Sequence, residues 1–138
     1  MWEIEAAKAA DMPEIEDLIA AVDGDRVDLA TEQFVVAKSE DAWILGCGRL
    51  RPYPEFCEIA SLAVVDDSRA TGIGRAIVEC LLEMYEGTIY LICDDEVVEF
   101  FRHFKFTQLP ESDIPDDLRP KWDYYCSPTE PMNLMRRG

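Results

Sequence analysis

Two glycines and two arginines gather in one short stretch of the sequence, R-A-T-G-I-G-R at residues 69–75. The stretch stands between an apolar run at residues 56–65 and a segment with helical periodicity. N–H groups at the start of a helix lack intrahelical partners and bind anions. Gly72 and Gly74 let the backbone curl so that these groups converge on a phosphate, and the arginines add charge. We therefore expect a phosphate-binding turn; the alternative is a plain loop in which the glycines only reverse the chain.

Two familiar phosphate-binding patterns do not fit this stretch. The P-loop requires G-K-[ST] after its glycines, and no such triplet occurs in the sequence. The dinucleotide fingerprint requires G-x-G-x-x-G in a parallel unit, followed by an acid about 20 residues later. The turn therefore belongs to another class of phosphate site.

Glu58 is an acidic residue in an otherwise apolar strand pattern, F-C-E-I-A-S-L-A-V-V at residues 56–65. Both faces of this pattern are mostly apolar, which is typical of a central strand buried on two sides. Partial burial tunes a carboxyl group toward accepting a proton near neutral pH. Glu58 is therefore a candidate general base; in the alternative it points to solvent near the start of the strand.

Arg49 and Arg51 lie two positions apart in the strand pattern at residues 42–51, so their side chains share one face. Arginine holds a carboxylate through two parallel hydrogen bonds. The pair is a candidate binding site for a carboxylate-bearing substrate. Alternatively, it forms an exposed rim that pairs with the surplus acids of the chain.

The remaining patterns predict the elements that position these residues. A first strand at 2–7 precedes a helix with Asp11 as N-cap and Glu14 as its capping-box partner. Strands at 34–39 and 42–51 form a hairpin across Glu40 and Asp41. A helix follows the glycine turn, then come a strand at 88–93, a helix at 96–104, a strand from 105, a proline-punctuated loop and a final strand at 132–137.

This order predicts one mixed α/β domain spanning residues 1–138. Three consecutive strands with tight connections imply antiparallel pairing, whereas the strand–helix–strand unit at 56–93 implies one parallel crossover. Helices are expected on both faces of the sheet.

The bulk composition limits the partners of the chain. With 29 acidic and 13 basic residues the net charge is −16, which repels nucleic acid and attracts cationic small molecules, or reflects salt adaptation. No apolar run is long enough for a membrane span, and the acidic N-terminal segment lacks the features of a secretory signal. The five cysteines show no C-x-x-C pair and are expected to be reduced, so we interpret the protein as cytoplasmic, with no metal and no membrane partner.

The glycine turn in this order of elements resembles the GNAT superfamily of N-acetyltransferases, whose signature is [QR]-x-x-G-x-[GA] between a strand and a helix. The aromatic segment E-F-F-R-H-F-K-F at 99–106 also looks like that family. More narrowly, residues 58–83 and 109–126 are similar to the acetyltransferase domain of N-acetylglutamate synthases and their short stand-alone relatives.

The resemblance implies a GNAT-like fold, a mostly antiparallel twisted sheet of six to seven strands with about four helices. It also implies acetyl-CoA as co-substrate and a possible homodimer. The coenzyme's pyrophosphate would be bound by Arg69, Ala70, Thr71, Gly72, Ile73, Gly74 and Arg75. Backbone N–H groups around Leu62, Ala63 and Val64 would grip the pantetheine arm and polarise the thioester carbonyl. Family members often carry a Glu at the position of Glu58, acting directly or through water.

The sequence departs from the family pattern at two positions. Many members have Tyr, the general acid on the leaving thiolate, where Phe101 stands, and Gly where Lys105 stands. Because Phe101 cannot donate a proton, we assign that role to Tyr124, with Tyr125 or a water molecule as alternatives.

The leading functional hypothesis is therefore an acetyl-CoA-dependent N-acetyltransferase that acts by direct ternary-complex transfer on a small-molecule amine. An amino acid such as glutamate is the favoured acceptor, with Arg49 and Arg51 holding its carboxylate. A polyamine, an aminoglycoside or a protein amine are alternatives. A non-catalytic module that senses acetyl-CoA is the competing hypothesis, which the missing Tyr at position 101 keeps open.

Overall fold

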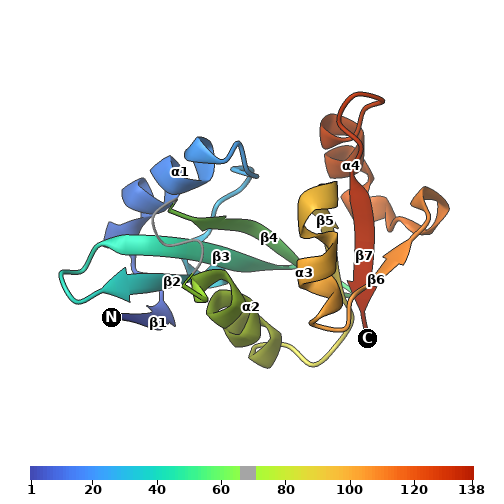
Figure 1. The fold of residues 1–138 in the computed structure, drawn as a ribbon. Coiled ribbons are helices and arrows are strands. Elements are labelled where there is room, and N and C mark those ends of the chain that lie inside the picture. Colours follow the sequence, from blue (N-terminus) through green and yellow to red (C-terminus); the bar gives the residue numbers. More distant parts are fainter. Residues whose placement is uncertain (66–70) are drawn as a thin grey trace. The chain divides into compact units, whose positions relative to one another are not determined.

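The computed structural model describes residues 1–65 and 71–138 (Figure 1). Over these residues the chain forms seven strands and four α-helices, with short 3-10 turns between them. The hydrogen-bonded strand order is β1-β2-β3-β4-β5-β7-β6. The elements are β1 (Trp2–Ala6), α1 (Met12–Ala21), β2 (Phe34–Ser39), β3 (Ile44–Pro52), β4 (Cys57–Val64), α2 (Ile73–Glu83), β5 (Ile89–Cys93), α3 (Val98–Arg102), β6 (Thr107–Leu109), α4 (Arg119–Tyr125) and β7 (Asn133–Arg137).

The predicted mixed α/β class and the mostly antiparallel sheet are confirmed. β1 pairs with β2 and β2 with β3 in antiparallel register. β4 pairs with β5 in parallel through Cys57–Ile89 and Glu58–Tyr90, which is the predicted crossover. β5, β7 and β6 are antiparallel neighbours. In the part of the chain that the structure describes, no helix is long and apolar enough to cross a membrane.

The chain divides into two compact units, each with its own interior. The first consists of Met1–Arg51 and Ile59–Glu86, and the second of Pro52–Glu58 and Gly87–Gly138. Strand β4 contributes its first two residues to the second unit and the rest to the first.

In the first unit, α1 and α2 cover opposite faces of the sheet, as predicted. Ile15 and Ile19 of α1 are fully buried in a cluster with Cys47 of β3. The neighbouring residues Gly46 and Gly48 point the other way, because side chains alternate along a strand. An added Cβ at Gly48 would lie 2.8 Å from Ile77 Cγ2 of α2. Glycine therefore lets α2 pack directly on the backbone of β3.

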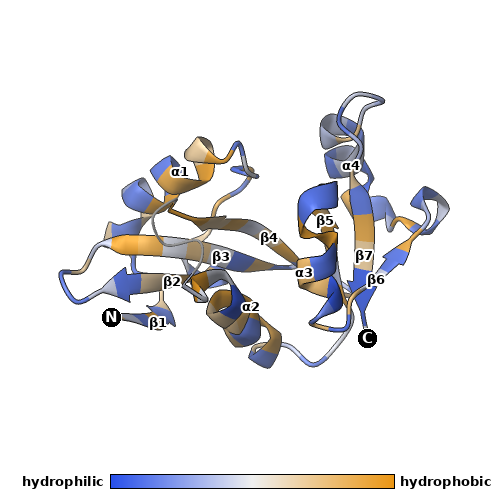
Figure 2. Ribbon diagram, viewed as in Figure 1, coloured by the Kyte–Doolittle hydropathy of each residue, from blue (hydrophilic) through white to orange (hydrophobic). Residues whose placement is uncertain are grey.

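Helix α2 is amphipathic, and its ribbon in Figure 2 carries both hydrophobic and hydrophilic stretches. Ile73, Ile77 and Leu81, which lie at helical spacing on one face, are fully buried. Met84 lies one residue beyond the helix and is half exposed. The predicted helix and its buried face are thus confirmed up to residue 83.

The predicted capping box at the start of α1 is wrong. The Asp11 carboxylate accepts the Lys8 N–H at 2.9 Å and closes the turn that precedes the helix. Glu14 Oε2 accepts the Ile44 N–H at 2.9 Å and so ties α1 to the start of β3. Both carboxylates accept a hydrogen bond from a backbone N–H, but neither donor is one that the capping box would use.

The second unit has an apolar core that includes part of the segment predicted as a loop. Residues 119–125 form helix α4, with Pro120 in its first turn, where proline is tolerated. Trp122 of α4 packs with Phe56, Leu118 and Leu134. The prediction of a loop was therefore wrong for these residues.

Candidate active site

The glycine turn opens helix α2 as predicted. Gly72 is the N-cap, with φ 83° and ψ 8°. This left-handed conformation is unfavourable for residues that carry a Cβ atom. An added Cβ would meet no heavy atom within 4 Å, so the conformation, not crowding, requires glycine here. Thr71 and Gly72 are exposed, and the Gly72 carbonyl accepts the first helical bond from Ala76 N–H at 3.0 Å. The first N–H groups of the helix have no intrahelical partners, and such groups bind anions such as phosphate.

The charges predicted around this turn are only partly described. Arg69 and Ala70 lie outside the described residues. Arg75 is an exposed residue on the first turn of α2 and pairs with Glu79 at 2.9 Å. An exposed ion pair of this kind contributes little to the stability of the fold and holds the arginine side chain weakly. Ile73 is fully buried and Gly74 half-buried, so in this part of the turn only the backbone is suited to contact a ligand.

The backbone segment Leu62–Val64 forms the end of β4. Leu62 and Val64 are half-buried, and Ala63 is buried in the core beside α1. The preceding residue, Ser61, has φ 56°, a left-handed conformation inside a strand. Such a residue costs about 1–3 kcal/mol and persists only where its surroundings enforce it. The predicted carbonyl-polarising segment therefore follows directly after a strained position.

Arg49 and Arg51 do share one face, but that face is covered by the chain itself. Arg49 is fully buried and lies 3.3 Å from the Asp25 carboxylate. Arg51 lies 3.2 Å from the same carboxylate, with only 13% of its side chain exposed. Because Asp25 takes the place predicted for a substrate carboxylate, the expectation that Arg49 binds the acceptor needs correction: its partners are internal. The alternative, an exposed rim that pairs with surplus acids, is wrong about the exposure, although both arginines do pair with an acid, Asp25.

Glu58 is fully buried, which excludes the alternative that it points to solvent. The Tyr53 hydroxyl donates to Glu58 Oε1 at 3.3 Å, and the Lys121 ammonium donates to Oε2. Tyr53 stacks on Phe56, with 4.9 Å between ring centroids. The carboxylate is thus oriented by an ammonium and a phenol and bounded by an aromatic pair.

The candidate general acids lie on helix α4. Tyr124 is 81% exposed, and its ring meets the ring of Tyr125 edge-on at 4.9 Å between centroids. Phe101 is buried and packs against Phe106, so it serves the core of the second unit. His103 is exposed at the end of α3.

Sequence reasoning missed the residues that hold these groups in place. Lys121 is 63 positions from Glu58, a separation at which no spacing rule operates. Tyr53 was within reach of prediction, because the short turn between β3 and β4 brings it back toward Glu58. Asp25 lies in a polar stretch that carries no periodic signal.

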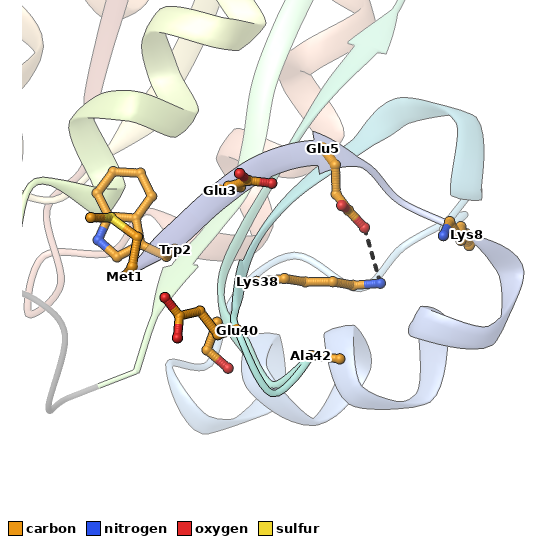
Figure 3. A pocket seen from close by; sticks show the side chains of 9 residues that line it. Met1, Trp2, Glu3, Glu5, Lys8, Lys38, Glu40 and Ala42 are labelled. Atoms are coloured by element: carbon orange, nitrogen blue, oxygen red, sulfur yellow. Dashed lines mark ion pairs between the residues drawn. The ribbon is translucent and has the colours of Figure 1, made fainter.

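A cavity of about 470 Å³ lies elsewhere in the first unit, at β1 and the end of β2 (Figure 3). Lys38 reaches across it and pairs with Glu5 at 3.2 Å and Asp11 at 2.9 Å. Hydrogen bonds to Asp11 and Glu5 raise the pKa of Lys38. The lining includes none of the residues that the sequence singled out for catalysis or binding: Met1, Trp2, Glu3, Glu5, Lys8, Lys38, Ser39, Glu40 and Ala42.

Residues 2–106 match the family described as Acetyltransferase (GNAT) family. The match spans most of the chain, and the chain therefore belongs to this family. No significant match to a curated protein was found.

Many solved structures share the fold, among them the following three. N-acetylglutamate synthase from Neisseria gonorrhoeae, complexed with coenzyme A and N-acetyl-glutamate, gives a TM-score of 0.82 at 17% identity, over 99% of this chain and 35% of that one. Rv2747 from Mycobacterium tuberculosis, solved with CoA and NLQ, gives 0.77 at 22% identity over 97% of both chains. The ribosomal-protein-S18-alanine N-acetyltransferase from Escherichia coli gives 0.73 at 14% identity, over 99% of this chain and 92% of that one. The chain thus spans about a third of the synthase, and these likenesses concern the fold.

Proposed function

We propose that the chain is an acetyl-CoA-dependent N-acetyltransferase that acetylates the amine of a small molecule. The observation that carries this proposal is the exposed, left-handed Gly72 as N-cap of α2, where the first helical N–H groups have no intrahelical partners. Family membership adds the chemistry, because the matched region includes both this turn and strand β4. Two of the similar structures were solved with coenzyme A, which supports the same co-substrate here.

The residues of the chain divide the work as follows. The N–H groups at the start of α2 bind the diphosphate of the co-substrate. The backbone around Leu62, Ala63 and Val64 donates to the pantetheine arm and to the thioester carbonyl oxygen. Glu58, directly or through water, takes a proton from the acceptor ammonium, and the freed amine nitrogen attacks the carbonyl carbon. The carbon–sulfur bond then breaks, and Tyr124, Tyr125 or water protonates the departing thiolate. The attacking nitrogen loses its second proton to solvent, and the acid regains a proton from solvent.

Lys121 and Tyr53 support this assignment of Glu58. A buried carboxylate is costly unless hydrogen bonds and a countercharge compensate it. Here a lysine and a tyrosine do so, although an apolar residue would fill the same place at lower cost. The presence of such a cluster in an apolar strand favours a catalytic role over a packing role.

Three classes of acceptor amine are candidates for this chain. The likeness to N-acetylglutamate synthase favours an amino acid. The burial of Arg49 beside Asp25 removes the side chain that would have held its carboxylate. The net charge of −16 favours the second candidate, a cationic amine such as a polyamine or an aminoglycoside. A protein amine remains the third, and a reducing compartment such as the cytoplasm suits the five free cysteines.

A thiol-release screen tests this function. The purified protein is incubated with acetyl-CoA and separate panels of amino acids, polyamines, aminoglycosides and peptides, and free coenzyme A is measured. Release that depends on one panel establishes the transferase and its acceptor class. Binding of acetyl-CoA without release in any panel would instead support the sensor module, for which Phe101 in place of Tyr is the supporting observation.

A further inference from the structure

A buried ionic cluster joins β3 to the segment between α1 and β2. The Asp25 carboxylate is nearly buried and lies 3.3 Å from Arg49 Nη2 and 3.2 Å from Arg51 Nη1. Both guanidinium groups also donate to the Val27 carbonyl, Arg49 at 2.9 Å. We call Asp25, Arg49 and Arg51 the arginine clamp.

The clamp fixes the backbone of residues 25–28. Asp25 Oδ1 accepts the Val27 N–H at 2.9 Å. Arg49 Nη1 donates to the Asp28 carbonyl at 3.2 Å. Two cations and one carboxylate therefore converge on main-chain groups of a single short segment. Such charge-assisted bonds are shorter and stronger than neutral ones, so the segment is held in one conformation.

The held segment in turn contacts β4 at its strained residue. Ser61 Oγ donates to the Asp25 carbonyl at 2.6 Å. On its other side, Cys47 Sγ donates to the Ser61 carbonyl at 3.5 Å. A left-handed residue inside a strand needs neighbours that enforce it, and Asp25 supplies one of them. Ser61 immediately precedes Leu62, Ala63 and Val64.

We propose that the arginine clamp is a positioning device for catalysis, which keeps Ser61 in its left-handed conformation and thereby aims the N–H groups of Leu62–Val64. This inference rests on the proposed function, in which those groups polarise the thioester carbonyl. The clamp residues do not touch the substrate; they act through Ser61. Loss of the clamp lets Ser61 relax toward extended backbone and turns the following N–H groups away.

Asp25→Asn is the direct test, because it keeps the shape of the side chain and removes its charge from both arginines. Asp28→Asn is the matched control. Asp28 lies three residues after Asp25, and its side chain is exposed. The control therefore removes the same charge from the surface, while the Asp28 carbonyl still accepts from Arg49. We expect Asp25→Asn to lower kcat at least about tenfold and to leave the Kd for coenzyme A within about threefold, since the start of α2 is unchanged. Asp28→Asn should match the wild type in both.

Amide hydrogen exchange gives a second readout that does not depend on turnover. The amides of residues 62–64 should exchange faster in Asp25→Asn than in Asp28→Asn. If Asp25→Asn does not fold, Ser61→Ala removes only the hydroxyl contact and should show the same split between kcat and Kd. If the wild type is active and a folded variant keeps both its kcat and its exchange rates, the positioning role of the clamp is overturned while the proposed function stands. If the wild type neither binds coenzyme A nor releases it from acetyl-CoA, the proposed function is overturned, and the role of the clamp falls with it.

Discussion

Glu58 is the residue on which the proposed chemistry depends, and its surroundings are its most informative property. It is fully buried in the second unit, with Lys121 and Tyr53 as partners. The apolar strand pattern around it predicts burial. The sequence does not predict Lys121, because tertiary structure alone brings the two together.

We expect Glu58→Gln to lower kcat/KM about 100-fold or more while the fold is kept, because the amide accepts hydrogen bonds but takes no proton.

Lys121→Met should instead destabilise the fold by about 3–5 kcal/mol, since it leaves a buried carboxylate without its countercharge. Denaturant unfolding and steady-state kinetics measure the two effects. The double variant serves as the control and should recover part of the lost stability. Full activity in Glu58→Gln would exclude it as the base.

The cysteines give a second prediction at this scale. All five are free, as expected, and burial raises the pKa of both Cys47 and Cys93 to about 12. The thiolate is the reactive form, so these two should resist a thiol reagent at pH 8 in the native protein. Cys80 and Cys126 are only half-buried and should react first. Mass spectrometry of the labelled protein, with a urea-unfolded sample as control, reads out the order; early labelling of Cys47 would contradict it.

At the scale of elements, the packing of α2 on β3 follows from two glycines in the strand. We expect Gly48→Ala to destabilise the protein by about 1–3 kcal/mol, because the added Cβ forces the helix outward. Gly72→Ala, which meets no atom within 4 Å, provides a comparison in which backbone strain acts without a clash. Thermal unfolding measures both. A Gly48→Ala protein as stable as the wild type would show that α2 is not held by this contact.

Periodicity predicted most elements, and the misses have physical causes. The helix after the glycine turn was predicted because its apolar residues recur with helical periodicity. Helix α4 was missed because the prolines around it are typical of a loop. Proline is nevertheless compatible with the first turn of a helix, which is where Pro120 lies. Asp11 is the N-cap of α1 as predicted, but the capping box does not form because Asp11 and Glu14 each bind a backbone N–H outside the expected pattern. Arg49 was misassigned because its partner, Asp25, is brought to it only by the fold.

At the scale of the whole molecule, the net charge of −16 should weaken the folded state through self-repulsion. We therefore expect 1 M NaCl to raise the Tm by several degrees, since about 1 kcal/mol corresponds to about 4 °C in a domain of this size. Near pH 4.2, the isoelectric point, the same salt should have little effect. A Tm that is insensitive to salt at pH 7 would show that the acids are already compensated.

The central claim is that the turn at the start of α2 binds the diphosphate of coenzyme A. Isothermal titration calorimetry tests it most directly, with the wild type, Gly72→Val and, as a ligand without the diphosphate, pantetheine. We predict saturable binding of coenzyme A by the wild type, at least about tenfold weaker binding by a folded Gly72→Val protein, and weak binding of pantetheine by both. Absence of binding by the wild type, or equal affinity in Gly72→Val, would contradict the account.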